Sequence, residues 1–477
     1  MKIHTSLSLF VLCFLVACSE EELNLAPISN ANTANFYTSA KDINQAVVAA
    51  YDALQDRAQY GQNFLYYMES RGDNAEVEDI VKGTGDEGNI DLFREIPASP
   101  LLNNTWISCY ACIQRCNAVL NRITNVAMDE KEKANRIGEV KFIRALTYFN
   151  MVRIWGQVPL ITKELESVDE AYALGKDNID AIYSTIIKDL LDAATTLPPT
   201  YAKTEAGRVT KGAALTLLGK VYLTLKNYQE AVTTLKQVVT AGTYTLLPNY
   251  AEVFDVAKEN GAESIFEIQF LKGGIGEGGI HARLTAPLGN ATLTGSVGNG
   301  IGDNLPTKNL LSQFDSTDAR LFVTIARLPD KRLYTTKYLD KPFVINDDSR
   351  NVIVLRYADV LLMLAEALNE LGYTANGDAF TLLNQVRTRA KLKPYTTANL
   401  ADQASFRLAI EKERRLELAL ENHRWFDLVR TGRALEVMNS YPELRTVLKV
   451  KEHQLLFPIP QGQVDVNPGK ITQNPGY

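Results

Sequence analysis

The chain has 477 residues, of which 46% are hydrophobic and 22% are charged, and its formal net charge is −6. A chain of this length and composition is globular and can bury one large core or several ordinary ones. The acidic balance argues against a nucleic-acid partner, because such a partner requires a basic face.

Residues 1–17 predict a signal peptide. Lys2 supplies a positive start, and the apolar run from Leu7 to Ala17 is too short to remain as a membrane span. The run ends in LVAC, and lipoprotein processing requires a cysteine directly after a small residue at the cleavage point. We therefore expect lipidation of Cys18, with two or more acyl chains that anchor the protein to a membrane without embedding it. An ordinary secretory signal with an incidental cysteine is the alternative.

Residues 18–35 have the composition of a flexible tether. Three consecutive glutamates follow Ser19, and the residues after them are polar without periodicity. As a random coil this segment would span roughly 20 to 25 Å, which lets a folded body sit just off the lipid headgroups. The body is expected over residues 36–477.

From Ser39 onward the spacing of apolar residues is helical. Ser39 and Asp42 have the spacing of a capping box, and the following residues up to Leu54 place their apolar side chains on one face. The body is therefore predicted to be mainly α. Similar amphipathic segments recur at residues 105–123, 132–154, 178–196, 210–226, 228–241, 355–371, 378–390 and 404–430.

Residues 211–239 carry the signal of a tetratricopeptide repeat. Small and large residues fall at the positions where this repeat packs its two helices, namely Leu218, Gly219, Tyr222, Ala231, Leu235 and Val238. A second copy covers 356–389, and 142–156 looks like a first helix whose partner is displaced beyond a loop. Three or more such units stack into a solenoid, so a tetratricopeptide-repeat helical scaffold is expected.

Cys109, Cys112 and Cys116 are spaced i, i+3 and i+7 and form one stripe of a predicted helix. We expect them to be buried small residues; a metal site is the alternative, weakened by the third spacing and by the lack of a nearby fourth ligand. No metal or cofactor is predicted. A structural calcium ion stays open, because the loops are rich in Asp and Asn, although none has the spacing of an EF-hand.

Two long segments, 60–104 and 271–305, break the helical pattern and are where we expect a ligand. The second contains ten glycines and follows a strand predicted at 263–270, and a loop of this length is usually functional or disordered. Sugars are recognised by flat aromatic faces and by planar polar groups. All three tryptophans fall in predicted framework helices, so tyrosine has to substitute. The candidate ligand residues are Tyr66, Tyr67, Arg71, Asp73, Asn74, His281 and Arg283, the alternative being a core tyrosine pair and solvated loop charges.

The stretch ENHRWFDLVRTG, residues 421–432, has the residue inventory of a hydrolase active site. On one continuous helix its charges, with Glu417 before it, would lie at i, i+3 and i+4 steps and pair with one another. No carboxylate would then be free to act as acid or base. We predict a structural ladder of charges and no catalytic residue. After Phe457 the chain is rich in proline and glycine and predicts an extended strap without helix.

The chain resembles the SusD/RagB family of nutrient-binding outer-membrane lipoproteins, and the resemblance covers nearly all of it. The acidic residues after Cys18 also resemble the surface-export signal of lipoproteins in the Bacteroidetes. The family motifs occur in order as the lipid cysteine, FYTSAKDINQAVVAAYDAL, FIRALTYFNMVRIWGQVPLI, the repeat pair at 210–241, RYADVLLMLAEALNE, ERRLELALENHRWFDLVRTGR and LLFPIPQGQVDVNPGKITQNPGY.

This resemblance implies a tetratricopeptide-repeat scaffold, the SusD-like α superhelix, that bears an irregular, loop-rich ligand-binding half. The N-terminal SusD-like part would cover about 36–240 and the C-terminal SusD/RagB part about 260–477. It also implies a non-catalytic lipoprotein at the outer membrane that faces the cell exterior. Such a protein binds oligosaccharides and delivers them to a SusC-like TonB-dependent porin. A peptide ligand, as in the RagB branch, and a helical glycoside hydrolase are the alternatives.

Overall fold

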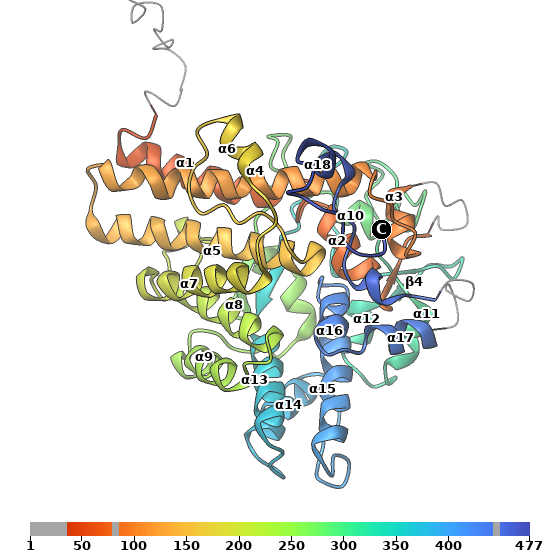
Figure 1. Ribbon diagram of the computed structural model, residues 1–477. Coiled ribbons are helices and arrows are strands. Elements are labelled where there is room, and N and C mark those ends of the chain that lie inside the picture. Colours follow the sequence, from red (N-terminus) through yellow and green to blue (C-terminus); the bar gives the residue numbers. More distant parts are fainter. Residues whose placement is uncertain (1–35, 79–84, 442–448) are drawn as a thin grey trace, which may run out of the picture.

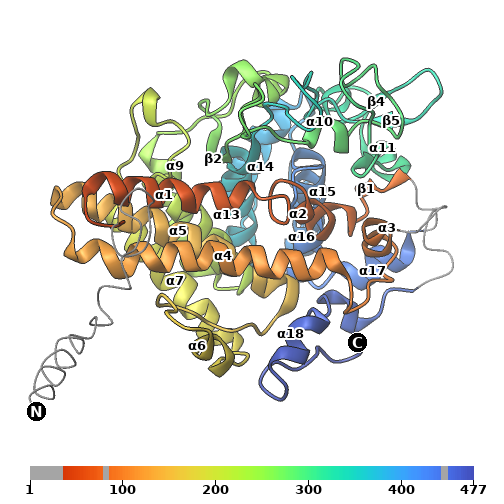
Figure 2. The same ribbon diagram turned by 90° about the horizontal axis from the view of Figure 1, so that it is seen from above.

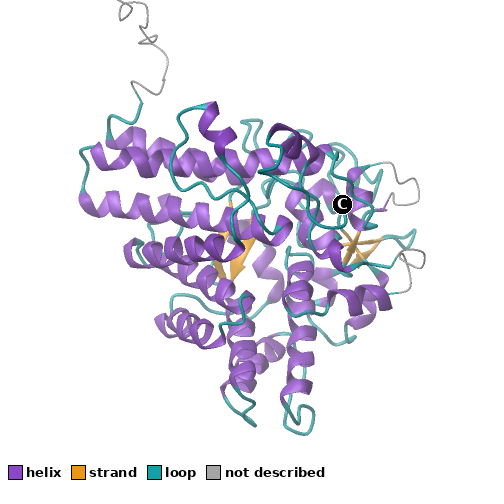
Figure 3. Cartoon of the chain, in the orientation of Figure 1, coloured by secondary structure: helices purple, strands orange, loops and turns teal. Residues whose placement is uncertain are grey.

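The computed structural model describes residues 36–78, 85–441 and 449–477. The predicted signal peptide, Cys18 and the tether at 18–35 lie outside these residues. Helices fill one half of the molecule and loops with short helices fill the other (Figures 1 and 3), which confirms the prediction of a mainly α chain. Among the helices described, none is both long enough and apolar enough to cross a membrane.

The helical half is a stack in which each long helix contacts the next one along the chain (Figure 1). This confirms the predicted repeat scaffold. The first helix predicted at 142–156 lies in α5, and the partner that the sequence placed beyond a loop is α7. The stacked helices are α1 (Ala40–Gln55), α4 (Pro100–Arg122), α5 (Glu130–Trp155), α7 (Ile179–Thr196), α8 (Lys211–Thr224), α9 (Tyr228–Ala241), α13 (Tyr357–Leu371), α14 (Asp378–Arg389) and α15 (Gln403–Glu417).

Local signals set the ends of these helices. The Ser39 hydroxyl accepts the Asp42 N–H and the Asp42 side chain accepts the Ser39 N–H, so the predicted capping box is present at α1. Helix α4 begins earlier than the apolar pattern indicated, because Pro100 occupies its first turn, where a missing N–H costs nothing.

Close packing of α8 on α9 depends on Gly219. A Cβ placed on this glycine would lie 2.4 Å from Cδ2 of the fully buried Leu235. The small and the large residue that the repeat pattern paired are therefore in direct contact, and the absence of a side chain on Gly219 lets the two helices approach.

A two-stranded antiparallel sheet lies between the helices and the loops (Figure 3). Strand β2 (Ser264–Ile268) is the predicted strand, and it pairs with β6 (Val352–Arg356), which was not predicted and whose last two residues fell in the helix predicted at 355–371. The smaller pairs are β1 (Ala75–Glu76) with β3 (Leu305–Pro306) and β4 (Ala326–Arg327) with β5 (Leu333–Tyr334).

The loop-rich half differs from the sequence prediction in two places. The predicted helix at 404–430 is broken, because Leu420 and Asn422 both have φ of 66° and a helix cannot continue through them. The tail after Phe457 is not wholly extended, since it contains the short helix α18. The short helices are α2 (Asn63–Leu65), α3 (Asp86–Asp91), α6 (Val168–Ala173), α10 (His281–Leu284), α11 (Lys308–Gln313), α12 (Leu321–Thr324), α16 (Arg424–Arg430), α17 (Ala434–Ser440) and α18 (Gln461–Val466).

One core joins the helical stack to the neighbouring loops. The three cysteines of α4 are fully buried in it, as predicted, and Cys112 Sγ lies 3.4 Å from the Thr147 hydroxyl. The three tryptophans are also buried, in α4, α5 and α16. None of them can therefore serve as an exposed stacking surface for a ligand.

Candidate ligand-binding site

The structure places Tyr66 and Tyr67 in the core, in a π-helical turn at Tyr66–Ser70. The Tyr66 hydroxyl donates to Asp303 over 2.6 Å, and the Tyr67 hydroxyl lies 3.1 Å from that of Thr105. Burial raises the pKa of both phenols well above its usual value. Tyr66 is thus bonded to the glycine-rich segment and Tyr67 to helix α4, so the two tyrosines connect the loop-rich half to the helical half. Neither side chain reaches a surface that a ligand could touch.

Arg71 is buried as well, between the rings of Phe93 and Phe457 at 3.8 and 4.4 Å from their centroids. Its guanidinium donates to both oxygens of Glu95, over 2.6 and 2.7 Å. This cation is buried and its charge is paired inside the protein, so it is unavailable to a ligand, contrary to the prediction.

Asp73 and Asn74 have the same structural role. Asp73 pairs with Arg424 over 2.7 Å and with Arg415 over 3.0 Å. Burial alone would raise the pKa of Asp73, but the two guanidinium groups outweigh it and hold that pKa well below its usual range. Asn74 accepts from Arg415 over 2.8 Å. Both residues tie the segment after the π-helical turn to α15 and α16.

Of the two candidates in the glycine-rich loop, one is buried and one is not. His281 lies with Nε2 3.0 Å from the Tyr60 carbonyl, and burial lowers its pKa to about 4, so the ring is neutral at pH 7. Arg283 keeps part of its surface exposed. Its Nε donates to the Asn299 carbonyl over 2.8 Å, and Nη1 donates to the Asn346 side chain.

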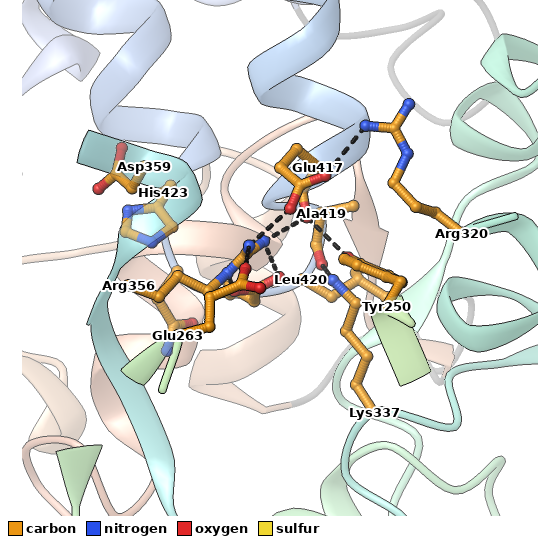
Figure 4. A network of polar contacts seen from close by, with 12 residues as sticks. Tyr250, Glu263, Arg320, Lys337, Arg356, Asp359, Glu417, Ala419, Leu420 and His423 are labelled. Carbon is orange, nitrogen blue, oxygen red and sulfur yellow. Dashed lines mark hydrogen bonds and ion pairs between the residues drawn. The ribbon is translucent and has the colours of Figure 1, made fainter. Parts of the chain in front are cut away.

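The charges near residues 421–432 are structural, but they do not form a ladder along one helix. Glu417 accepts from Arg356 over 2.6 Å and from Arg320 over 3.1 Å (Figure 4). Glu421 accepts from Lys337 over 2.6 Å. Both carboxylates contact Arg356 of β6, and their other partners come from two loop segments and from Arg389 at the end of α14. Burial opposes ionisation of Glu417, yet its arginine partners outweigh it and lower its pKa well below the usual range.

The surface of the loop-rich half carries an apolar group that the sequence analysis missed. The tip of the 339–349 loop exposes three consecutive side chains, of which Phe343 is 63% exposed, and Arg283 and Asn346 lie next to it. Figure 2 shows α10 and the loops around it on the opposite side of the molecule from α18. We call these exposed apolar side chains, together with the two polar side chains next to them, the platform. It consists of Leu271, Ile275, Arg283, Phe343, Val344, Ile345 and Asn346.

Buried aspartates hold the two loops of the platform together. Asp347 accepts the N–H groups of Gly273 and Gly274, both over 2.9 Å, and Asp348 accepts the Ala282 N–H over 2.9 Å. Lys272 pairs with Asp340 over 2.7 Å. The loops are thus fixed by carboxylate contacts to backbone donors and by one isolated antiparallel β-bridge between Gly279 and Asp348.

Two glycines allow the platform side chains to converge. Gly274 has φ of 71°, and the Phe343 ring lies 3.5 Å from where its Cβ would be. Gly298 has φ of 72°, and a Cβ there would lie 3.0 Å from both Arg283 Nε and Ile345 Cγ1. The glycine content of this loop therefore lets an aromatic ring, an aliphatic side chain and a guanidinium group share one surface.

A cleft of about 480 Å³ lies beside α4, at the end of α1. Its lining carries a carboxylate, two amides and two guanidinium groups, which can bond sugar hydroxyls. Other clefts lie on the helical half, including one of about 350 Å³ between residues 199–210 and β2. The polar lining of the first cleft consists of Asp56, Arg57, Asn63, Asn104, Ser108 and Arg115.

The sequence did contain a signal for the platform. The stretch KPFVINDD places three apolar residues between a proline and two aspartates, where a loop would otherwise be polar.

In the part of the chain that the structure describes, no group of three His, Cys, Asp or Glu side chains is placed to hold a metal ion.

Two family models match the chain. One, described as the SusD family, covers residues 329–477, and the other, described as starch-binding associating with outer membrane, covers residues 23–223. The SusD-like protein P25 of Formosa agariphila is 30% identical, and the match covers 98% of both chains.

Solved structures have the same fold. A laminarin-binding SusD-like protein is 28% identical with a TM-score of 0.79, and the match covers 92% of this chain and 100% of that one. A SusD homologue from Bacteroides thetaiotaomicron is 26% identical with a TM-score of 0.81, covering 93% and 98%. The chain therefore belongs to the SusD/RagB family.

Proposed function

We propose that this chain is a cell-surface lipoprotein that binds oligosaccharides on its loop-rich half, without cleaving them, and delivers them to a SusC-like TonB-dependent transporter. Membership of the family supports the role, and the 28% identical relative that binds laminarin supports a glycan ligand. The lipid at Cys18 would hold the protein on the outer membrane, facing the cell exterior.

The observation that carries the glycan proposal is the exposed ring of Phe343 beside Arg283 and Asn346. A flat aromatic face covers the apolar face of a sugar ring, while guanidinium and amide groups bond its hydroxyls. Asp340, Asp347 and Asp348 are all engaged in holding the loops. Glycosidic cleavage requires two carboxyl groups free to act as acid and as base or nucleophile, so this arrangement favours binding over hydrolysis.

Replacement of Phe343 by Ala tests the proposal. The full-length chain in detergent is applied to an oligosaccharide microarray, and the best ligand is then titrated. We expect F343A to weaken binding about fivefold to tenfold, the value of one lost ring contact, with an unchanged melting temperature because the ring is exposed. F322A removes a ring that is 75% exposed on α12 and serves as the control.

Three results would each contradict a part of the proposal. Unchanged affinity of F343A would remove the platform from the binding site, and cleaved sugar in the incubation mixture would make the protein an enzyme. A pull-down from solubilised membranes that recovers no large β-barrel protein would remove the transporter partner.

A peptide is the second candidate ligand, because four exposed aliphatic side chains surround Phe343. They are Leu271, Ile275, Val344 and Ile345. Retention of peptides, with no retention of any oligosaccharide on the array, would favour this alternative.

A further inference from the structure

Arg57 lines the cleft and Arg283 belongs to the platform, and among the described residues neither has a carboxylate partner. The two hydrogen bonds of the Arg283 side chain go to a carbonyl and to an amide oxygen, both neutral. Arg57 is exposed on the cleft, and its side chain makes no ion pair with any described residue. Asp56, its neighbour, accepts the Ala58 N–H over 2.7 Å.

The two arginines are held near each other by the framework. The contact of 3.0 Å between His281 Nε2 and the Tyr60 carbonyl joins the segment of Arg57 to that of Arg283. Burial lowers the pKa of Arg283, and the positive charge of Arg57 lowers it further. The two guanidinium groups are thus close enough to repel each other.

Two other surface arginines show the usual neutralised arrangement, whereas the exposed Arg94 and Arg327, like Arg57, form no ion pair with a described residue. Arg122 pairs with Glu164 over 2.8 Å, and Arg332 pairs with Glu78 over 3.0 Å. On the platform itself the ammonium group of Lys272 is matched by Asp340, while Asp347 and Asp348 point to backbone N–H groups. Carboxylate groups are therefore present in this region, but none of the described ones forms an ion pair with Arg57 or Arg283.

Building on the function proposed above, we infer that the oligosaccharide bound here carries an anionic substituent, either a sulfate ester or a uronate carboxylate, which is received between Arg57 and Arg283. A guanidinium group presents a planar fork of N–H donors that matches two oxygens of such an anion. Nη2 of Arg283 has no hydrogen-bond partner among the described residues, so it can donate to a ligand without breaking an existing bond.

The test titrates the full-length chain in detergent with three sets of oligosaccharides. Laminarin and starch fragments are neutral, carrageenan fragments carry sulfate esters, and alginate fragments carry carboxylates. We expect the tightest binding in one of the two acidic sets, and that set identifies the anion. Binding should weaken about tenfold or more between 50 and 500 mM NaCl, because partly exposed charges are screened.

Substitutions at the two arginines test whether they bind the anion. We expect R57Q and R283Q each to lower the affinity for the acidic ligand about tenfold to a hundredfold, the value of one charged hydrogen-bond partner. R283K, which keeps the charge but loses the fork, should lie between R283Q and the parent chain. K131Q removes one exposed positive charge on α5 and should leave the affinity unchanged. Melting temperatures show that each variant is folded.

The outcomes separate this inference from the proposed function. If a neutral oligosaccharide binds tightest, or if R57Q and R283Q behave like K131Q, the inference is overturned while glycan binding stands. If none of the three sets binds, the proposed function itself fails, and this inference fails with it.

Discussion

The Asp303 carboxyl group is buried where the two irregular segments of the chain meet. It accepts from the Tyr66 hydroxyl over 2.6 Å, and its backbone N–H donates to the Leu284 carbonyl over 2.8 Å. Burial and the neighbouring charge of Glu87 raise its pKa to about 7, although the bond from Tyr66 opposes the shift. An acid of this kind makes stability depend on pH in the neutral range.

We predict that D303N removes part of the pH dependence of stability. The folded-state pKa is above that of the unfolded chain, so the contribution of Asp303 is fully present below about pH 4 and is lost as the pH rises to about 7. Urea unfolding at pH 5 and pH 8 should show the parent chain more stable at pH 5. That difference should shrink in D303N by on the order of 2 to 3 kcal/mol.

An exposed aspartate provides the control for this measurement. Asp402 caps α15 through the Ser405 N–H and has a lowered pKa, through the hydrogen bonds from Ser405, so it is ionised at both pH values. D402N should therefore change the stability equally at pH 5 and pH 8. An unchanged pH dependence in D303N would show that Asp303 is ionised in the folded protein at both pH values.

At the scale of single residues, composition could locate the irregular segments but not the exposure of their side chains. Tyr66 looks like a sugar-binding residue in the sequence, yet its partner Asp303 is 237 positions away, and only the folded chain brings the two together. Phe343 was overlooked because it stands in a short apolar run far from the glycine-rich loop. Arg283, in the short helix α10, is the one candidate of the seven whose side chain is partly exposed as predicted.

At the scale of elements, periodicity predicted helices well where an amphipathic face repeats over several turns. It predicted α13 to within two residues but missed β6, because the apolar stretch VIVL passes into the helix with only Arg356 and Tyr357 between them and no glycine or proline to mark the change. Pairing of β6 with β2, far away in the chain, decides the conformation there. The break between α15 and α16 was hidden because Leu420 and Asn422, and no glycine, adopt the left-handed conformation.

The contact between α8 and α9 can be tested by G219A. The added Cβ would lie 2.4 Å from a side-chain carbon of the buried Leu235, so the two helices must move apart or Leu235 must change rotamer. We expect the free energy of unfolding to fall by about 1 to 3 kcal/mol, as for other overpacked cores. Chemical denaturation measures it.

A second glycine in a helix separates overpacking from a general effect of alanine. A Cβ on Gly88 in α3 would have no neighbour within 4 Å, so G88A should leave stability unchanged or raise it slightly through helix propensity. If G219A were as stable as G88A, the close approach of α8 and α9 would not depend on the missing side chain.

At the scale of the whole molecule, the helical half forms the framework and the loop-rich half presents the variable surface. The stacked helices bury a continuous core and hold buried ion pairs such as that between Arg356 and Glu417, which fix the start of α13 against the end of α15. The loop-rich half keeps its exposed side chains in place through Asp347 and Asp348, so it can vary its surface while the framework is retained. The function proposed above also requires that the protein be attached to the outer membrane, and we proposed the lipid at Cys18 for this role.

We predict that this attachment depends on Cys18. In cells that produce the full-length chain, the parent protein should be recovered with the outer membrane and be cleaved by protease added outside intact cells. C18A cannot accept acyl chains, and each buried methylene contributes roughly 0.8 kcal/mol to membrane binding, so it should be lost from the membrane fraction. S19A alters the adjacent position and should behave like the parent. Recovery of C18A at the cell surface in the parent amount would mean that another part of the chain provides the anchor.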